Sequence, residues 1–230
     1  MFYFDPMYLL FAAPALLLAM FAQWKVSSAY DKYTKVRNSK NIAGIEVAKY
    51  LLRANGLNLN VQGTPGQLTD HYDPRNKTLY LSQGVAQQPS VAALAIVAHE
   101  VGHAVQDSQG YLPMRLRAWL VAPANIGPWI GYILFIAGIF INMSGLVWLG
   151  ILFFSAGLVF SLATLPVEFN ASSRALEMLR KSALVGAGEV DAAQAVLTAA
   201  ALTYVAAAAQ SLSQLLYYVF VALNLRSRDD

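Results

Sequence analysis

The sequence predicts an α+β membrane protein that is mostly helical, with a small β-sheet and several transmembrane helices. Hydrophobic residues make up 57% of the 230 residues, and charged residues make up only 13%. Ordinary soluble domains contain about 45–50% apolar and about 25% charged residues, so this composition is typical of a chain that enters a bilayer. Long apolar runs near both ends of the chain flank one stretch of soluble-type sequence.

We divide the chain into four parts, beginning with an N-terminal transmembrane anchor at residues 1–24. Its apolar run, Met7–Trp24, has about the length that a membrane span needs. No Lys or Arg precedes this run, whereas a secretory signal peptide carries positive charge there, so we expect an uncleaved anchor. Residues 25–118 are expected to form a soluble-type region, residues 119–165 a transmembrane hairpin, and residues 166–230 a helix followed by an apolar C-terminal helix.

Basic residues beside the spans predict the orientation in the membrane. The first span is followed by Lys25, Lys32, Lys35, Arg37 and Lys40. Cytoplasmic segments carry an excess of Lys and Arg, so we expect this flank in the cytoplasm and the N-terminus outside. Arg115 and Arg117 place the start of the hairpin in the cytoplasm as well. Arg226 and Arg228 favour a cytoplasmic C-terminus, whereas a full fourth span over Val190–Leu225 would place them outside, and the sequence leaves this conflict open.

The soluble-type region is expected to contain a helix, a small sheet and a helix that carries two histidines. An amphipathic pattern predicts a helix over Asn41–Asn55, and Ser90 is a suitable N-cap for a second helix from Val91 to about Gln106. Three short β-like runs lie between them: Leu57–Gln62, Gln67–Tyr72 and Lys77–Ser82. Within the last run, Thr78–Ser82 is either an edge strand that binds an extended peptide or an interior strand.

The second half of the chain is expected to be mostly membrane-embedded. Two spans, Pro123–Ile141 and Leu146–Leu165, are separated by a tight turn and therefore form a hairpin. Small residues in the hairpin, including Gly131 and Gly150, are typical of closely packed membrane helices. A separate helix is expected to begin at the proline of Pro166–Ser182.

The strongest chemical signal is the H-E-x-x-H motif at His99-Glu100-Val101-Gly102-His103. Residues i and i+4 share one helix face, so His99 and His103 can bind one zinc ion. Glu100 then lies beside the metal, where it can act as a general base. The surrounding helix is apolar, and burying these polar groups would cost several kcal/mol without a partner. The alternative is a helix whose histidines are satisfied core residues.

A catalytic zinc ion needs a third protein ligand, and Glu168 is the best candidate. The chain has no cysteine, so this ligand must be His, Asp or Glu. Glu168 directly follows an apolar span, where an acid is costly unless it is paired or bound to metal. The alternative is an acidic residue at a helix N-terminus, which the helix dipole favours.

Four segments resemble the YugP-like neutral zinc metallopeptidases of bacteria: Asp70–Arg75, Ala98–Gln106, Leu165–Ala175 and Ala201–Ala206. More distantly the chain is similar to HtpX-type membrane proteases and CAAX prenyl proteases, which carry a glutamate ligand in an E-x-x-x-D pattern after a membrane hairpin. The resemblance implies a zincin-like catalytic region with Glu168 as third ligand. Ser172 stands where those relatives have Asp, so the carboxylate that supports a zinc histidine is either missing or supplied by Asp107 or Asp73.

Two further residues are candidates for contacts with the substrate or the transition state. His71 lies on a predicted strand beside the motif, and the alternative is a surface histidine next to a turn. Tyr204 is a candidate oxyanion donor, and the alternative is an aromatic residue that packs on an Ala-rich helix.

Together these features predict a gluzincin-like, membrane-anchored zinc metalloendopeptidase that hydrolyses peptide bonds with a zinc-activated water. The site is expected at the cytoplasmic surface of the bacterial inner (plasma) membrane, in a multi-pass protein. The expected partners are a protein or peptide substrate and the lipid bilayer, and any regulatory membrane partner is unknown. Nucleic acid is excluded because the basic residues form no long run. The alternative is a catalytically silent membrane adaptor, and the intact Glu100 argues against it.

Overall fold

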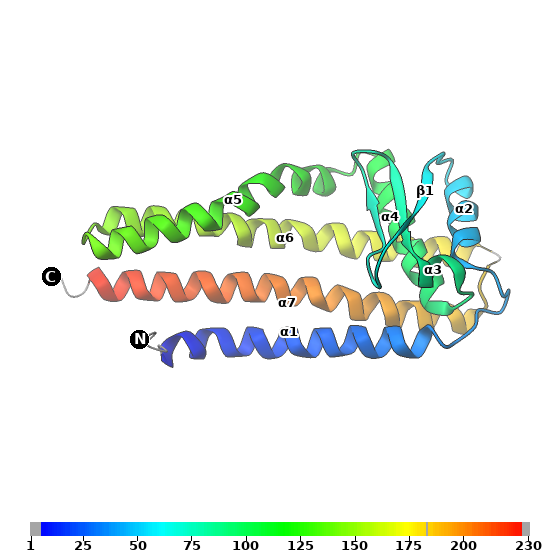
Figure 1. Ribbon diagram of the computed structural model, residues 1–230, viewed down its shortest axis with the longest axis horizontal. Helices are drawn as coiled ribbons and strands as arrows, with labels where there is room; N and C mark the ends of the chain where they lie inside the picture. The colour runs from blue at the N-terminus through cyan, green and yellow to red at the C-terminus, as the bar shows by residue number, and fades with distance from the viewer. Residues whose placement is uncertain (1–5, 183, 227–230) are drawn as a thin grey trace. The chain divides into compact units, whose positions relative to one another are not determined.

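The computed structural model describes residues 6–182 and 184–226 (Figure 1). The chain divides into two compact units. Unit 1 comprises Met1–Ala22, Arg115–Leu165 and Thr203–Asp230. Unit 2 comprises Gln23–Met114 and Pro166–Leu202. Most of the described residues are helical and a small sheet accompanies them, so the predicted fold class is confirmed.

Among the described residues, four helices are long and apolar enough to cross a membrane. They are α1 Pro6–Tyr33, α5 Leu112–Phe140, α6 Ser144–Lys181 and α7 Ala187–Arg226. Each is longer than the apolar run that predicted it, because an apolar run marks only the part suited to hydrocarbon and the helix continues into polar sequence. The C-terminal helix therefore qualifies as a fourth span by length and composition. Arg228, whose charge opposed that interpretation, lies outside the described residues.

Pro166 lies inside α6, so the prediction that it begins a separate helix is wrong. A proline removes one backbone donor and usually kinks or ends a helix. The segment before Pro166 is apolar enough to lie in a bilayer, where ending the helix would leave its last carbonyls without hydrogen-bond partners. Losing a single hydrogen bond at the proline is the smaller cost, and α6 continues to Lys181.

In unit 1, α5 and α6 pack closely through glycine. A Cβ atom added to Gly131 would lie 2.7 Å from the carbonyl oxygen of Gly150, and one added to Gly150 would lie 2.7 Å from that of Gly131. Neither position can carry a side chain without moving a helix backbone.

Helices α1 and α7 run beside each other, and the rings of Tyr8 and Tyr217 meet edge to face at 5.1 Å (Figure 1).

Unit 2 contains a three-stranded sheet with the order β1-β3-β2. Strand β1 (Asn60–Thr64) pairs in parallel with β3 (Thr78–Ser82), and β2 (His71–Asp73) pairs with β3 in the antiparallel sense. Because β3 is the central strand, the hypothesis that Thr78–Ser82 is an edge strand for a peptide is wrong. The edges belong to β1 and β2.

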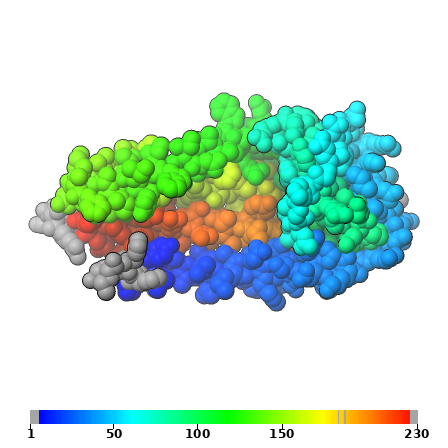
Figure 2. All heavy atoms as spheres, in the orientation of Figure 1, coloured from blue at the N-terminus to red at the C-terminus, as the bar shows by residue number. Residues whose placement is uncertain are grey.

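Helix α4 (Val91–Ser108) is the central helix of unit 2 and is buried over most of its length. The Ser90 hydroxyl accepts a hydrogen bond from the Ala93 N–H at 3.2 Å, which confirms the predicted N-cap. The helix shares one apolar core with α2 (Gly44–Ala54), the sheet and parts of α6 and α7; the core includes Val47, Leu51, Leu79, Leu81, Leu94, Val97, Val101, Leu179 and Leu197. The strands and the short helix α3 (Gln83–Gln87) form a continuous surface, in cyan and blue-green in Figure 2.

Candidate metal centre

Helix α4 presents His99 and His103 one turn apart. Their rings lie 4.7 Å apart, centroid to centroid, in an edge-to-face arrangement. This is the geometry expected from the i, i+4 spacing, which places both side chains on one face of the helix. Both imidazoles are largely shielded from solvent, with 12% of the His99 side chain and 11% of the His103 side chain exposed.

Glu168 of α6 meets both histidines. Its Oε2 atom lies 3.2 Å from the Nε2 atom of His99 and 3.4 Å from the Nε2 atom of His103. The candidate ligand atoms of the three residues all lie within 4.8 Å of one another. Two imidazole nitrogens and one carboxylate oxygen form a ligand set typical of catalytic zinc, and the buried carboxylate of Glu168 needs a cationic partner. The three residues therefore fit a zinc ion.

A glycine allows α4 and α6 to approach at this group. A Cβ atom added to Gly102 would lie 2.7 Å from the carbonyl oxygen of Ala171. The two backbones are therefore in contact between the two histidines, and this contact brings Glu168 within reach of both rings. Gly102 occupies one of the two unspecified positions of the motif, and the helix packing explains why glycine is found there.

Glu100 is buried beside His99, His103 and Glu168, which together are called the metal group below, and it has its own hydrogen-bond partner. Its Oε2 atom accepts a hydrogen bond from the backbone N–H of Tyr72 at 3.0 Å. Burial raises the pKa of Glu100, and the nearby histidines oppose that rise. A carboxylate with a raised pKa is a stronger base than an ordinary glutamate, which suits a group that accepts a proton near neutral pH.

The second ring nitrogen of each histidine is held by a neutral side chain. The Nδ1 atom of His99 lies 3.2 Å from Ser172 Oγ, and the Nδ1 atom of His103 lies 3.0 Å from Gln106 Oε1. The sequence left open whether a supporting carboxylate is missing or supplied by Asp107 or Asp73, and at these two ring nitrogens the structure supports the first alternative. Ser172 holds His99 from the position where the distant relatives have Asp, and a hydroxyl there accepts or donates without adding charge.

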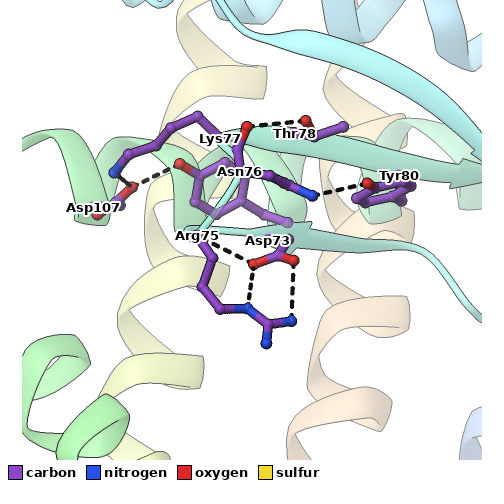
Figure 3. Close-up of polar contacts among 8 residues, drawn as sticks. Asp73, Arg75, Asn76, Lys77, Thr78, Tyr80 and Asp107 are labelled. Carbon is purple, nitrogen blue, oxygen red and sulfur yellow. Dashed lines mark hydrogen bonds and ion pairs between the residues drawn. The ribbon is translucent and has the colours of Figure 1, made fainter.

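Asp107 instead helps to hold β2 against α4. Its carboxylate accepts hydrogen bonds from the Tyr72 hydroxyl at 2.6 Å and from the Lys77 ammonium (Figure 3). Burial and the Asp107 carboxylate raise the pKa of Tyr72 well above its usual range, so the phenol stays protonated and donates. Tyr72 thus contacts α4 twice, through its hydroxyl at Asp107 and through its backbone N–H at Glu100.

His71 lies on the exposed side of the sheet and contacts neighbouring residues there. The His71 ring is exposed and stacks on Tyr80 at 4.7 Å, and its Nδ1 atom lies 2.8 Å from the Thr69 carbonyl oxygen. On the same exposed side of the sheet, Asn76 donates to the Tyr80 hydroxyl at 2.9 Å (Figure 3). Tyr204 lies on α7, in the part of that helix that belongs to unit 1. A role for either residue in substrate contact stays a prediction.

Sequence patterns did not single out Tyr72, which donates to Glu100, or Gln106, which contacts His103. One local signal was available for Gln106, because it lies three residues after His103 and therefore on the same side of the helix. The contact of Tyr72 with Glu100 joins segments 28 residues apart in the chain, and no local pattern indicates it.

Comparison with known proteins connects this geometry to an activity. Residues 8–223 match the family described as "Putative neutral zinc metallopeptidase". The chain is also 42% identical over 216 residues to a Bacillus subtilis (strain 168) protein named "Putative membrane protease YugP", with 94% of this chain and 96% of that protein covered. No solved structure matches the chain. The region matched to the family includes all three residues of the metal group.

Proposed function

Because this chain belongs to the neutral zinc metallopeptidase family, we propose that it is a membrane-anchored zinc metalloendopeptidase that uses Glu100 as its general base. The observation that carries the proposal is the convergence of His99, His103 and Glu168, whose ligand atoms lie within 4.8 Å of one another. These residues come from two helices and are separated by up to 69 positions in the chain. Their convergence beside a buried glutamate supports a catalytic site over an apolar core that merely contains histidines.

The proposal gives each residue a distinct task. His99, His103 and Glu168 would hold zinc, which when bound acts as a Lewis acid that activates water and polarises a peptide carbonyl. Glu100 would accept the proton of the attacking water and pass it to the leaving amine. The Tyr72 N–H holds one oxygen of Glu100 and leaves the other available for this transfer.

The proposed location is the cytoplasmic surface of the bacterial inner membrane. Four candidate spans and the relative named as a membrane protease support a membrane protein. The basic residues that follow the first span, including Lys35, Arg37 and Lys40, support a cytoplasmic site by the positive-inside rule. Proteins or peptides that reach this surface would be the substrates.

Metal content and hydrolysis measured together test the proposal. Wild type, Glu100→Gln and His103→Ala would be purified in detergent, analysed by mass spectrometry for zinc, and assayed on a labelled unstructured protein. We expect about one zinc ion per chain in wild type and in Glu100→Gln, and loss of zinc in His103→Ala. Glu100→Gln should lower the hydrolysis rate by about 10²–10⁴-fold, the usual contribution of a general base.

Two matched variants serve as controls. Glu177→Gln removes an exposed carboxylate from α6 and should retain both zinc and hydrolysis. His71→Ala removes the remaining histidine and should retain zinc. Wild type without zinc, zinc retained in His103→Ala, or full hydrolysis by Glu100→Gln would each contradict the proposed function.

A further inference from the structure

Gln106 is a fully buried amide at the centre of a chain of hydrogen bonds behind the metal group. Its Oε1 atom lies 3.0 Å from the Nδ1 atom of His103. Its Nε2 atom donates to the Val167 carbonyl oxygen at 2.8 Å and to Asn170 Oδ1 at 2.9 Å. These two bonds use both hydrogens of the amide nitrogen, so that nitrogen is saturated.

The orientation of this amide is fixed by a partner that can only accept. A backbone carbonyl has no proton to give, so the group facing Val167 must be the NH₂ end of Gln106. The oxygen end then faces His103, and an amide oxygen also only accepts. His103 must therefore carry a proton on Nδ1, and its neutral form presents the Nε2 lone pair, on the side where Glu168 lies.

The orientation of Asn170 is fixed in turn by a group that can only donate. The Arg174 Nε atom donates to Asn170 Oδ1 at 2.7 Å, and its Nη1 atom donates to Gln109 Oε1 at 2.8 Å. A guanidinium has no acceptor, so the oxygen of Asn170 must face it. That same oxygen receives the second hydrogen of Gln106.

We propose that Arg174, Asn170 and Gln106 form a directional hydrogen-bond relay that keeps a proton on His103 Nδ1 and so directs the His103 Nε2 lone pair to the metal. This inference rests on the proposed function in one respect, namely that the metal bound by His103 is zinc. These three are positioning residues, because they act through His103 and touch neither substrate nor metal.

Two features favour this arrangement over a carboxylate partner for His103. Glu100 and Glu168 are already buried at the group, and a third carboxylate at the fully buried position of Gln106 would lack a cationic partner of its own. The amide of Gln106 supplies the same acceptor without that charge. Its bond to Val167 also ties α4 to the turn of α6 that carries Glu168, so one side chain orients one ligand and anchors the backbone next to another.

The first test follows the proton itself in zinc-free protein. Histidine labelled with ¹⁵N in detergent-solubilised protein reports which ring nitrogen carries hydrogen, and the chain has only three histidines to assign. We expect a slowly exchanging Nδ1–H on His103 in wild type. Arg174→Met should speed its exchange about tenfold, and Gln106→Leu should abolish the slow exchange. Asn170→Asp should preserve it, because a carboxylate accepts from both Gln106 and Arg174.

The second test measures the zinc dissociation constant by competition with a chelator. Changes to groups that orient metal ligands typically weaken metal binding by about 10–100-fold, and we expect Gln106→Leu in that range. Arg174→Met, one step further from the ligand, should lie near about tenfold, while Asn170→Asp should stay close to wild type. Arg180→Met, which removes an exposed arginine of the same helix, is the matched control and should change neither quantity.

The outcomes separate the relay from the proposed function. Wild-type protein without zinc would contradict the proposed function, yet the Nδ1–H signal in zinc-free protein would still decide the relay. The relay is overturned if wild-type His103 lacks hydrogen on Nδ1, or if Arg174→Met exchanges that proton as slowly as wild type. Arg174 is only partly buried, so this variant decides the question even if Gln106→Leu does not fold.

Discussion

The backbone N–H of Tyr72 donates to Glu100 Oε2 at 3.0 Å, so an edge strand of the sheet holds the proposed general base. The Tyr72 side chain secures that strand, because its hydroxyl donates to Asp107 at 2.6 Å near the end of α4. Lys77 neutralises the same carboxylate. The position of Glu100 therefore depends on a contact that lies seven residues further along its own helix.

Tyr72→Phe is expected to lower the hydrolysis rate without removing zinc. The variant loses a hydrogen bond to a charged acceptor, worth about 1.5–3 kcal/mol, and frees β2 to move away from Glu100. We expect kcat to fall several-fold while zinc content stays at the wild-type level. The comparison is Tyr80→Phe, which removes a hydroxyl from the exposed side of the neighbouring strand. Equal rates in wild type and Tyr72→Phe would show that this contact does not position the base.

The same phenol predicts a dependence of stability on alkaline pH. The folded state raises the pKa of Tyr72, so unfolded chains release this proton first as the pH rises through about 10, the ordinary value for tyrosine. The stabilisation is fully present below that pH and is lost progressively above it. Thermal unfolding of wild type and Tyr72→Phe should therefore differ most near neutral pH and converge above pH ~10. A difference that is constant across this range would contradict the pKa shift.

Gly102→Ala is expected to destabilise unit 2 and weaken zinc binding together. The new methyl group would lie 2.7 Å from the Ala171 carbonyl oxygen, so α4 and α6 must separate. Overpacking of this kind costs about 1–3 kcal/mol, and separation also moves Glu168 away from the histidines. Thermal unfolding and chelator competition would measure the two effects. Gly63→Ala meets no atom within 4 Å and should change neither, and a Gly102→Ala protein as stable as that control would argue against the close helix contact.

Local sequence pattern was sufficient for the parts of the site that one helix determines. The i, i+4 spacing places His99 and His103 on one face whatever the rest of the chain does. Glu168 was within reach of sequence reasoning because an acid next to an apolar span needs a partner. Gln106, Asn170 and Arg174 were not, since their roles depend on the register of α4 against α6, up to 65 residues apart.

The sheet and α6 show the same limit. Strand β3 is central because it pairs with β2 on one side and with β1 on the other. The pair with β1 is parallel, so no tight turn joins the two strands, and no turn signal in the sequence reveals the pairing. Pro166 looked like a helix start because local propensity favours that interpretation. The need to satisfy backbone carbonyls in an apolar segment outweighs the local preference, and that need appears only when the whole helix is considered.

Ser172→Asp is expected to strengthen zinc binding, and Ser172→Ala to weaken it. The Ser172 hydroxyl lies 3.2 Å from His99 Nδ1, and a carboxylate there would accept a shorter, charge-assisted bond from the same ring. We expect the dissociation constant to fall by about tenfold in Ser172→Asp and to rise by about tenfold in Ser172→Ala. Ser173→Asp places the same charge on the exposed neighbouring residue and serves as the control. A similar increase in zinc affinity in both aspartate variants would show that added negative charge, and not a hydrogen bond to His99, causes the tighter binding.

Cysteine labelling can determine which side of the membrane the proposed site faces, because the chain contains no cysteine of its own. Gln67→Cys lies in an exposed loop of unit 2, and Met143→Cys lies in the exposed turn between α5 and α6. The positive-inside rule places residue 67 in the cytoplasm and residue 143 outside. In intact spheroplasts, a membrane-impermeant maleimide should therefore label Met143→Cys only, and Gln67→Cys should react after the cells are opened. Labelling of Gln67→Cys but not of Met143→Cys in intact cells would invert the topology, and the proposed substrates would then be proteins outside the cytoplasm. Labelling of both in intact cells would mean that α5 does not cross the membrane, although its length and apolar composition suit a span.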